Sequence, residues 1–194
     1  DTLTYRSLTT PFLVTMTAPD SGTVVSSGIG STFVGIEHII LGQGNDTFIG
    51  SSGDDVITGS KGNDSLSGGA GDDRFLIAAW DGNDTIDGGD GFDTIVLTGA
   101  SASLFWPGIS GVETIDTSGA SNVRVMGDAA ANLIDISGFA LANVTLIDGG
   151  QGNDTITGTG GGDTILGNGG TDSLIGGAGN DLFLVSSYAT DRFD

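Results

Sequence analysis

A nine-residue pattern that closes on an aspartate and leads into a short strand-like triplet is the dominant feature of this chain. Ten aspartates mark it: Asp46, Asp55, Asp64, Asp73, Asp84, Asp93, Asp154, Asp163, Asp172 and Asp181. Two residues after each one comes a large apolar side chain: Phe48, Ile57, Leu66, Phe75, Ile86, Ile95, Ile156, Ile165, Leu174 and Phe183. A nine-residue unit cannot bury its own apolar residue, so the units must stack on one another.

The triplet after each aspartate predicts a short strand, because Thr, Ser and Val flank the apolar residue. The middle residue of such a triplet points to one face and its neighbours to the other. Each unit therefore sends one apolar anchor inward, and the Gly-rich segment before the aspartate reverses the chain. Two units make one coil of 18 residues, so Asp46 lies over Asp64 and Asp154 over Asp172. The expected fold is all-β, a parallel β-roll or β-solenoid.

Stacked carboxylates repel one another, and a hard divalent cation between them removes that repulsion. Calcium takes 6–8 oxygen ligands in irregular geometry, which carboxylates and turn carbonyls can supply, whereas magnesium requires a tight octahedron. We expect about six calcium ions, held by the pairs Asp46/Asp64, Asp55/Asp73, Asp64/Asp84, Asp73/Asp93, Asp154/Asp172 and Asp163/Asp181. The Asp64/Asp84 pair is the less regular one, because Ile77-Ala78 is inserted and its spacing is 20 residues. The turn glycines expected beside the aspartates are Gly42, Gly44, Gly53, Gly62, Gly71, Gly82, Gly91, Gly150, Gly152, Gly161, Gly170 and Gly179.

The composition excludes several other kinds of site. The net charge of −20 makes nucleic acid and anionic membrane surfaces unfavourable partners. The chain has no cysteine and one histidine, which excludes disulfides and disfavours transition metals. No apolar run approaches the roughly 20 residues that span a bilayer.

The repeats resemble the RTX family of nonapeptide calcium-binding repeats, Gly-Gly-x-Gly-x-Asp-x-(apolar)-x. Two segments, 68–76 and 176–184, match at every specified position, whereas Leu41, Ser51 and Ala79-Trp80 replace glycines of the pattern in other copies. The resemblance implies a parallel β-roll in a secreted, extracellular bacterial protein, which could sit at the cell surface. It also implies type I export from Gram-negative bacteria, disorder at low cytosolic calcium, and folding outside the cell.

The spacing of the repeats divides the chain into four parts. Residues 1–40 form an N-terminal strand and cap segment, with a strand pair or hairpin packing on the first coil. Residues 41–97 form a first calcium-binding block and 149–194 a second one, and we interpret the chain as part of a longer array. Residues 98–148 are expected to continue as a solenoid without calcium; an insert of another fold is the alternative.

Asparagine replaces the aspartate in this middle part. Strand-like runs start at Val112, Val123, Leu133, Val144 and Thr155, and Asn122, Asn132 and Asn143 precede three of them. These asparagine side chains could form a hydrogen-bonded ladder in place of the metal.

The leading hypothesis is a non-enzymatic calcium-binding module. One alternative is a surface-layer or adhesin segment that associates with itself or binds polysaccharide through calcium, with Trp80, Phe105 and Trp106 as candidate sugar contacts. Another is part of a β-helix enzyme that modifies polysaccharides. No catalytic or organic-cofactor residues are expected: His38 has no nucleophile motif around it, and Glu37 and Glu113 are interpreted as turn or strand-edge residues.

Overall fold

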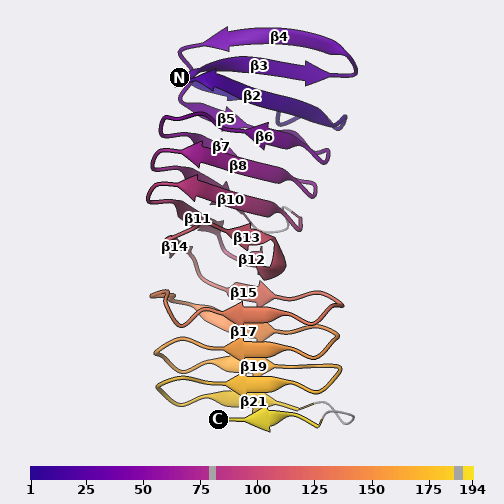
Figure 1. Cartoon of the computed structure of the whole chain (residues 1–194), viewed down its shortest axis with the longest axis vertical. Coiled ribbons are helices and arrows are strands. Elements are labelled where there is room, and N and C mark those ends of the chain that lie inside the picture. The colour runs from indigo at the N-terminus through magenta and orange to yellow at the C-terminus, as the bar shows by residue number, and fades with distance from the viewer. Residues whose placement is uncertain (79–81, 186–189) are drawn as a thin grey trace. The chain divides into compact units, whose positions relative to one another are not determined.

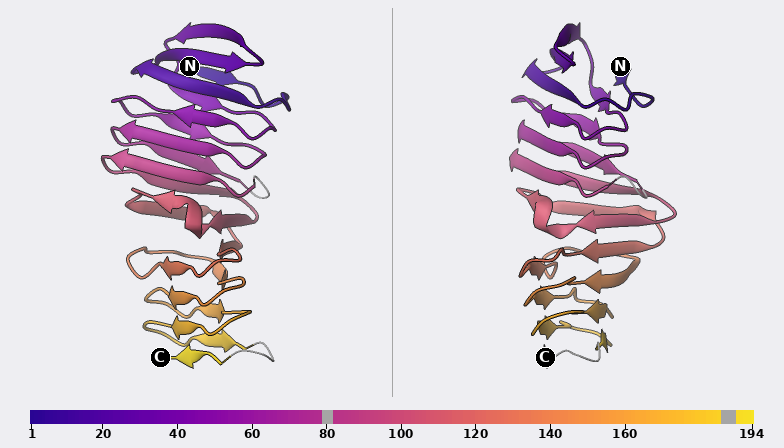
Figure 2. Two further views of the ribbon diagram at one scale, coloured as in Figure 1. Left: turned by 45° about the vertical axis from the view of Figure 1, so that its right-hand side comes forward. Right: turned by 90° about the vertical axis from the view of Figure 1, so that its right-hand side faces the viewer.

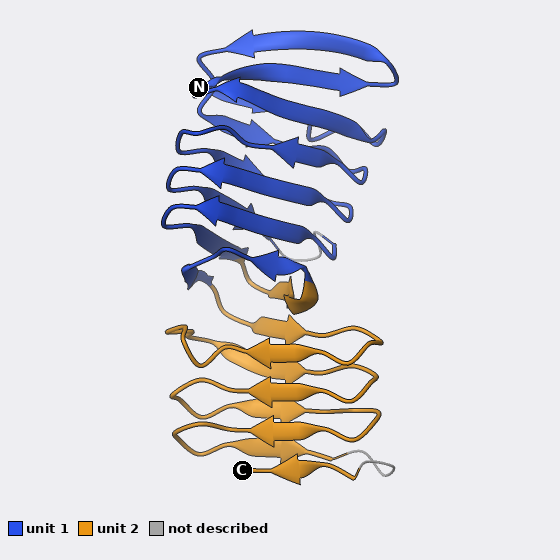
Figure 3. Ribbon diagram, viewed as in Figure 1, with its two compact units in different colours: residues 1–98, 108–119 blue, residues 99–107, 120–194 orange. Residues whose placement is uncertain are grey.

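The computed structural model describes residues 1–78, 82–185 and 190–194 (Figure 1). Its regular elements are β-strands, apart from a single 3-10 turn at Trp106–Gly108. The chain divides into two compact units, and within each unit the strands of successive coils lie side by side (Figure 2, Figure 3). Residues 1–98 and 108–119 form the first unit, and residues 99–107 and 120–194 form the second. No helix of the described part is long and apolar enough to cross a membrane.

The first unit contains two sheets. One has the order β1 (Thr2–Thr4), β5 (His38–Ile40), β7 (Val56–Thr58), β9 (Arg74–Ile77), β11 (Thr94–Gly99) and β14 (Thr114–Ala120). The other has the order β13 (Ile109–Ser110), β10 (Thr85–Asp90), β8 (Ser65–Ala70), β6 (Thr47–Ile49), β2 (Phe12–Ala18), β3 (Ser21–Ser26) and β4 (Ile29–Val34). Consecutive strands along the chain alternate between the sheets through β5–β11, as a solenoid requires.

The second unit also contains two sheets. One has the order β12 (Ala102–Phe105), β15 (Val123–Met126), β17 (Val144–Asp148), β19 (Thr164–Leu166) and β21 (Leu182–Leu184). The other has the order β16 (Leu133–Asp135), β18 (Thr155–Thr157), β20 (Ser173–Ile175) and β22 (Arg192–Phe193). All the pairs in these two sheets are parallel. The predicted all-β parallel solenoid is therefore confirmed.

The register between coils follows the repeat. Phe48 pairs with Leu66 and Ile57 with Phe75, each across 18 residues. The inserted pair lengthens the next coil to 20 residues, and Ile77 enters the core opposite Leu97. Nine of the ten predicted anchors are buried; the tenth, Phe183, is half-buried and contacts the ring of Phe193 at 5.3 Å between centroids. Burial of each anchor contributes about 1.5–3 kcal/mol, so the stacked row is the core of the fold.

The middle region differs in detail from the expectation. β15, β16 and β17 begin at Val123, Leu133 and Val144 as predicted. The strand expected at Val112 begins at Thr114 instead, because the chain turns through Gly111, whose φ is +59°. The strand β12 was not predicted.

The expected asparagine ladder is wrong for Asn122 and Asn143. The Asn143 side chain donates to the carbonyl of Ala120 at 2.9 Å, and Asn122 accepts from the hydroxyl of Thr145. Val123 pairs with Val144, so the two asparagines precede paired residues, yet their side chains bond to other groups.

Three antiparallel strands end one sheet of the first unit. β2 pairs in parallel with β6, and β3 and β4 then follow in antiparallel order. Phe12, Val14, Met16 and Val24 of β2 and β3 are buried. The apolar residues on this end thus cover the first coil on that face.

Candidate metal centre

The aspartates of the repeat are buried, which is unusual for carboxylates. Nine of the ten have an exposed fraction of 6 % or less, and Asp73 and Asp93 are at 0 %. The tenth, Asp181, is half-buried. Each lies directly before the strand that its own repeat forms. The register of that strand therefore fixes where the carboxylate points.

Six of the ten carboxylates accept a hydrogen bond from the repeat aspartate of the preceding coil. The Oδ1 atom of one aspartate accepts the backbone N–H of the aspartate one coil earlier; we call this the inner ladder. The donor–acceptor distances are 2.8 Å for Asp46/Asp64, 2.7 Å for Asp55/Asp73, 2.9 Å for Asp64/Asp84, 2.8 Å for Asp73/Asp93, 2.8 Å for Asp154/Asp172 and 2.9 Å for Asp163/Asp181. The structure thus brings together all six aspartate pairs that the sequence predicts, including the pair at 20-residue spacing.

The second carboxylate oxygen is left for another ligand. The Oδ2 atoms of Asp73, Asp93, Asp154 and Asp172 are buried and have no hydrogen-bond donor. Burying a carboxylate oxygen without a partner costs on the order of 1–3 kcal/mol of folding free energy, and more when the group is charged. A cation bound there would remove that cost.

Glycines at the first position of the repeat shape the space beside the Oδ2 atoms of the repeat aspartates, including Asp163, whose Oδ2 accepts the Thr159 N–H at 2.7 Å. An ideal Cβ on Gly158 would lie 2.6 Å from Oδ2 of Asp163 and 2.5 Å from the carbonyl oxygen of Gly176 in the next coil. Its φ is an ordinary one, so glycine is needed here for space. A carboxylate oxygen and a carbonyl oxygen from successive coils therefore converge on one point, as a shared cation requires.

The predicted turn glycines lie in the same turns. Gly62, Gly71, Gly82, Gly91, Gly152, Gly170 and Gly179 have positive φ, and Gly150 does as well. A Cβ on Gly170 would collide with the carbonyl of Gly152 one coil earlier. Gly42 donates its N–H to Oδ2 of Asp46 at 2.9 Å. Gly44, Gly53 and Gly161 do not have positive φ, and they lie in the same stacked turns.

The comparison with known families agrees with this geometry. A family model described as the RTX calcium-binding nonapeptide repeat (4 copies) matches residues 40–75, 76–95 and 148–183. The chain carries RTX calcium-binding repeats. The matched family is not a catalytic one, and no curated protein matches the chain.

Backbone oxygens must complete any metal site in these RTX turns. Within the described residues, no three His, Cys, Asp or Glu side chains come together as a metal-binding group. Two carboxylates per level are too few for calcium, which takes 6–8 oxygens. The remaining oxygens have to be the stacked turn carbonyls and water, which is the arrangement predicted from the sequence.

Burial raises the pKa of several RTX aspartates above the ordinary value of 3.8. Loss of water around the carboxyl raises the pKa of Asp73 to about 7, and the nearby carboxylates of Asp55 and Asp93 add to the effect. Burial likewise raises the pKa of Asp154 to about 6, with Asp172 adding to the effect. The pKa values of Asp46, Asp55 and Asp93 are raised for the same first reason.

The raised pKa values predict that acid favours the calcium-free fold. Between pH 4 and the folded-state values of about 7 for Asp73 and about 6 for Asp154, the folded protein binds more protons than the unfolded one. The contribution of these two groups to stability is therefore greatest below about pH 4 and is lost as the pH rises through these values. In calcium-stripped protein, circular dichroism should show more strand at pH 5.5 than at pH 8. The calcium concentration for half-saturation should rise on acidification, because the ion must displace these protons. A strand signal that falls on acidification would contradict the assignment.

Two features of the RTX turns were not predicted. One is the first-position glycine, as at Gly158. The other is an outer ladder at the fifth position, where a side-chain Oδ1 accepts the N–H of the equivalent residue one coil later. Its bonds are Asn45 from Asn63 at 3.0 Å, Asp54 from Asp72 at 2.9 Å, Asn63 from Asn83 at 3.0 Å, Asp72 from Phe92 at 2.9 Å and Asn153 from Thr171 at 2.9 Å. The recurrence of Asn or Asp before the repeat aspartate was the available signal.

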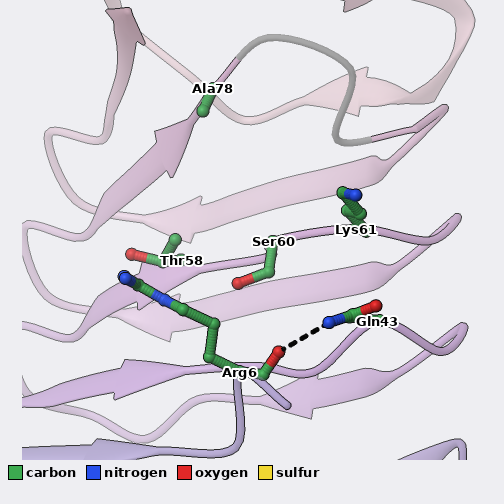
Figure 4. Close-up of a pocket in the computed structure, with 6 residues that line it drawn as sticks. All are labelled: Arg6, Gln43, Thr58, Ser60, Lys61 and Ala78. Carbon is green, nitrogen blue, oxygen red and sulfur yellow. Dashed lines mark hydrogen bonds between the residues drawn. The ribbon is translucent and has the colours of Figure 1, made fainter. Parts of the chain in front are cut away.

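A pocket on the first unit has different chemistry. Figure 4 shows Arg6, Gln43, Thr58, Ser60, Lys61 and Ala78 around it, with the Gln43 amide donating to the Arg6 carbonyl at 3.1 Å. No carboxylate lines this pocket, although Gln43, Ser60 and Lys61 belong to the turns that precede Asp46 and Asp64. His38 lies on β5, as predicted, and its Nε2 is 2.9 Å from the hydroxyl of Thr58. Burial and then the charge of Arg6 lower the pKa of His38.

The structure describes two of the three aromatic residues considered as sugar contacts. The Trp106 ring meets the Phe139 ring edge-on, with 5.8 Å between centroids. Phe105 ends β12 and is half-buried. Trp80 lies outside the described residues. The observed contact of Trp106 favours a role in packing.

Proposed function

We propose that this chain is a calcium-binding β-roll module of a secreted bacterial protein, and that it folds when it meets calcium outside the cell. The observation that carries the proposal is the set of buried Oδ2 atoms without donors at Asp73, Asp93, Asp154 and Asp172. In a chain of net charge −20, such oxygens require a counter-charge. RTX repeats are typical of extracellular bacterial proteins exported by type I systems, which supports this part of the proposal.

The proposed ligands are the aspartates and turn glycines predicted from the sequence. Calcium would supply positive charge between coils, and the chain's carboxylates and turn carbonyls would hold it. Six Ca²⁺ ions carry twelve positive charges, against the net charge of −20. Ion binding and folding are then one event, because the two halves of each site lie in different coils.

We assign these six ions to the aspartate pairs of residues 41–97 and 149–194, and none of the six to residues 98–148. This assignment is supported by the two exposed asparagines, Asn122 and Asn143, which stand outside the inner ladder. Asn132 does continue that ladder, because its N–H donates to Oδ1 of Asp154 at 2.9 Å. Its neutral amide brings no charge to the coil.

The ion count of the purified chain tests the proposal. Elemental analysis after dialysis against millimolar calcium should give about 5–7 calcium ions per chain, a number that follows from one ion per aspartate pair. The same protein dialysed against equal magnesium should retain far less metal. Less than one calcium per chain would refute the proposed function.

A further inference from the structure

Glu113 takes the place of an aspartate at the end of one column. The strands β5, β7, β9, β11 and β14 follow one another in one sheet of the first unit (Figure 1), and Glu113 is the residue before β14. Its Oε2 accepts the N–H of Asp93 at 2.8 Å. Oδ1 of Asp93 accepts the N–H of Asp73 at 2.8 Å in the same way. Glu113 is therefore the next member of the inner ladder.

The oxygens around Gly88 repeat the arrangement found around Gly68 in the preceding coil. An ideal Cβ on Gly88 would lie 2.5 Å from Oδ2 of Asp93 and would collide with the carbonyl oxygen of Gly111. At Gly68, one coil earlier, the same place is shared by Oδ2 of Asp73 and the carbonyl oxygen of Gly88, 2.6 Å away. Gly111 thus supplies the carbonyl that a first-position glycine supplies in a complete repeat.

The Asp93 side chain requires a partner at this level. It is fully buried, and its Oδ2 has no hydrogen-bond donor. The ion pairs among the described residues involve Glu37 and Asp148, so neither Asp93 nor Glu113 has a cationic side chain paired with it. Within the described part of the chain, no protein cation therefore compensates these two carboxylates.

The turn that carries Glu113 is shorter than an RTX turn. Asp87 pairs with Ser110. Six residues, 88–93, separate Asp87 from β11, whereas three residues, 111–113, separate Ser110 from β14. The outer half of the loop is missing on one side, and the longer glutamate side chain reaches Asp93 from the shortened turn. The coordination positions that this half-loop would have filled are open to water, which calcium accepts readily.

We propose that Asp93 and Glu113, with the carbonyl of Gly111, hold one further calcium ion that closes this column. The inference rests on the proposed calcium binding of the repeats, and it adds a site at which a glutamate and a three-residue turn replace half of an RTX pair. All the groups that converge there are oxygens, as calcium prefers.

The test compares Glu113→Gln with Glu37→Gln in the full chain. The glutamine side chain of the first variant keeps an oxygen that can accept the Asp93 N–H, so the ladder and the fold are preserved while the charge is removed. Glu37 is the matched control, since it has the same Gly-x-Glu context before a strand, yet a Cβ on Gly35 has nothing within 4 Å. Calcium stoichiometry by elemental analysis and stepwise affinities by titration calorimetry are measured for both variants and the parent.

Glu113→Gln should bind one calcium fewer than the parent, or show one binding step weakened about tenfold or more, as expected when a site loses a charged ligand. Glu37→Gln should match the parent. If Glu113→Gln binds calcium as the parent does, or loses no more than Glu37→Gln, the additional site is refuted while the proposed function stands. A parent that binds no calcium would instead refute the proposed function itself.

Discussion

Removal of calcium is expected to convert this protein from strand to coil. At a calcium concentration ten times the dissociation constant, each site stabilises the folded state by about 1.4 kcal/mol. About six independent sites would then contribute roughly 8 kcal/mol, which is comparable with the whole stability of a typical domain, about 5–15 kcal/mol. Without the ions, the carboxylates of Asp55, Asp73 and Asp93 repel one another in a buried column. Circular dichroism in chelator should show coil, and millimolar calcium should restore the strand spectrum.

Magnesium at the same concentration is the control for this experiment. It should leave the coil spectrum largely unchanged, because its small octahedral shell does not fit irregular carbonyl turns. Equal strand content in chelator and in calcium would show that folding does not depend on the ion.

Replacing Asp73 by asparagine is expected to have opposite effects with and without calcium. The Asp73 carboxylate contacts both neighbouring coils. Its Oδ1 accepts the N–H of Asp55 in the preceding coil, and its buried Oδ2 faces the Gly88 carbonyl of the following coil. Asp73→Asn should therefore cost at least one calcium ion and raise the calcium midpoint of folding roughly tenfold, since affinity follows the number of charged ligands. In calcium-free protein at pH 8 it should stabilise residual structure, because it removes a carboxyl whose pKa is raised to about 7.

The neighbouring substitution Asp72→Asn is the matched control. Asp72 is exposed and its Oδ1 accepts the N–H of Phe92 in the outer ladder, a bond that an asparagine oxygen keeps. Calcium titrations followed by circular dichroism should give the parent midpoint for this variant. Identical behaviour of the two variants would show that the buried column does not hold the metal.

The sequence predicts most of this fold because the residues that become buried recur at the period of the repeat. A residue such as Phe48 or Ile57 recurs at a fixed distance from the aspartate, so the coil length and the pairing of each repeat with the next but one follow directly. The six aspartate pairs follow from that pairing. The insertion at Ile77 could be located in the sequence, and the structure shows that the core absorbs it without breaking the Asp64/Asp84 bond.

Other features depend on three-dimensional contacts that no period encodes. The sequence shows that Gly158 is a glycine, but only the coordinates show that the space beside it is filled by two oxygens. Glu37 and Glu113 share a Gly-x-Glu context in the sequence, yet the bond from Asp93 to Glu113 depends on a turn shortened by three residues. The bonds that Asn122 makes with Thr145 and Asn143 with the Ala120 carbonyl depend on local contacts between coils.

The two ladders run in opposite directions along the chain. In the inner ladder a coil's amide is satisfied by the coil that follows it, as Asp55 is by Asp73. In the outer ladder a coil's amide is satisfied by the coil that precedes it, as Asn63 is by Asn45. Loss of a terminal coil from either side consequently leaves a backbone N–H of the neighbouring coil without its acceptor. This costs about 1–3 kcal/mol where that N–H is buried. Because the inner-ladder bonds are buried and the outer-ladder bonds are exposed, losing a coil on the C-terminal side destabilises its neighbour more than losing one on the N-terminal side.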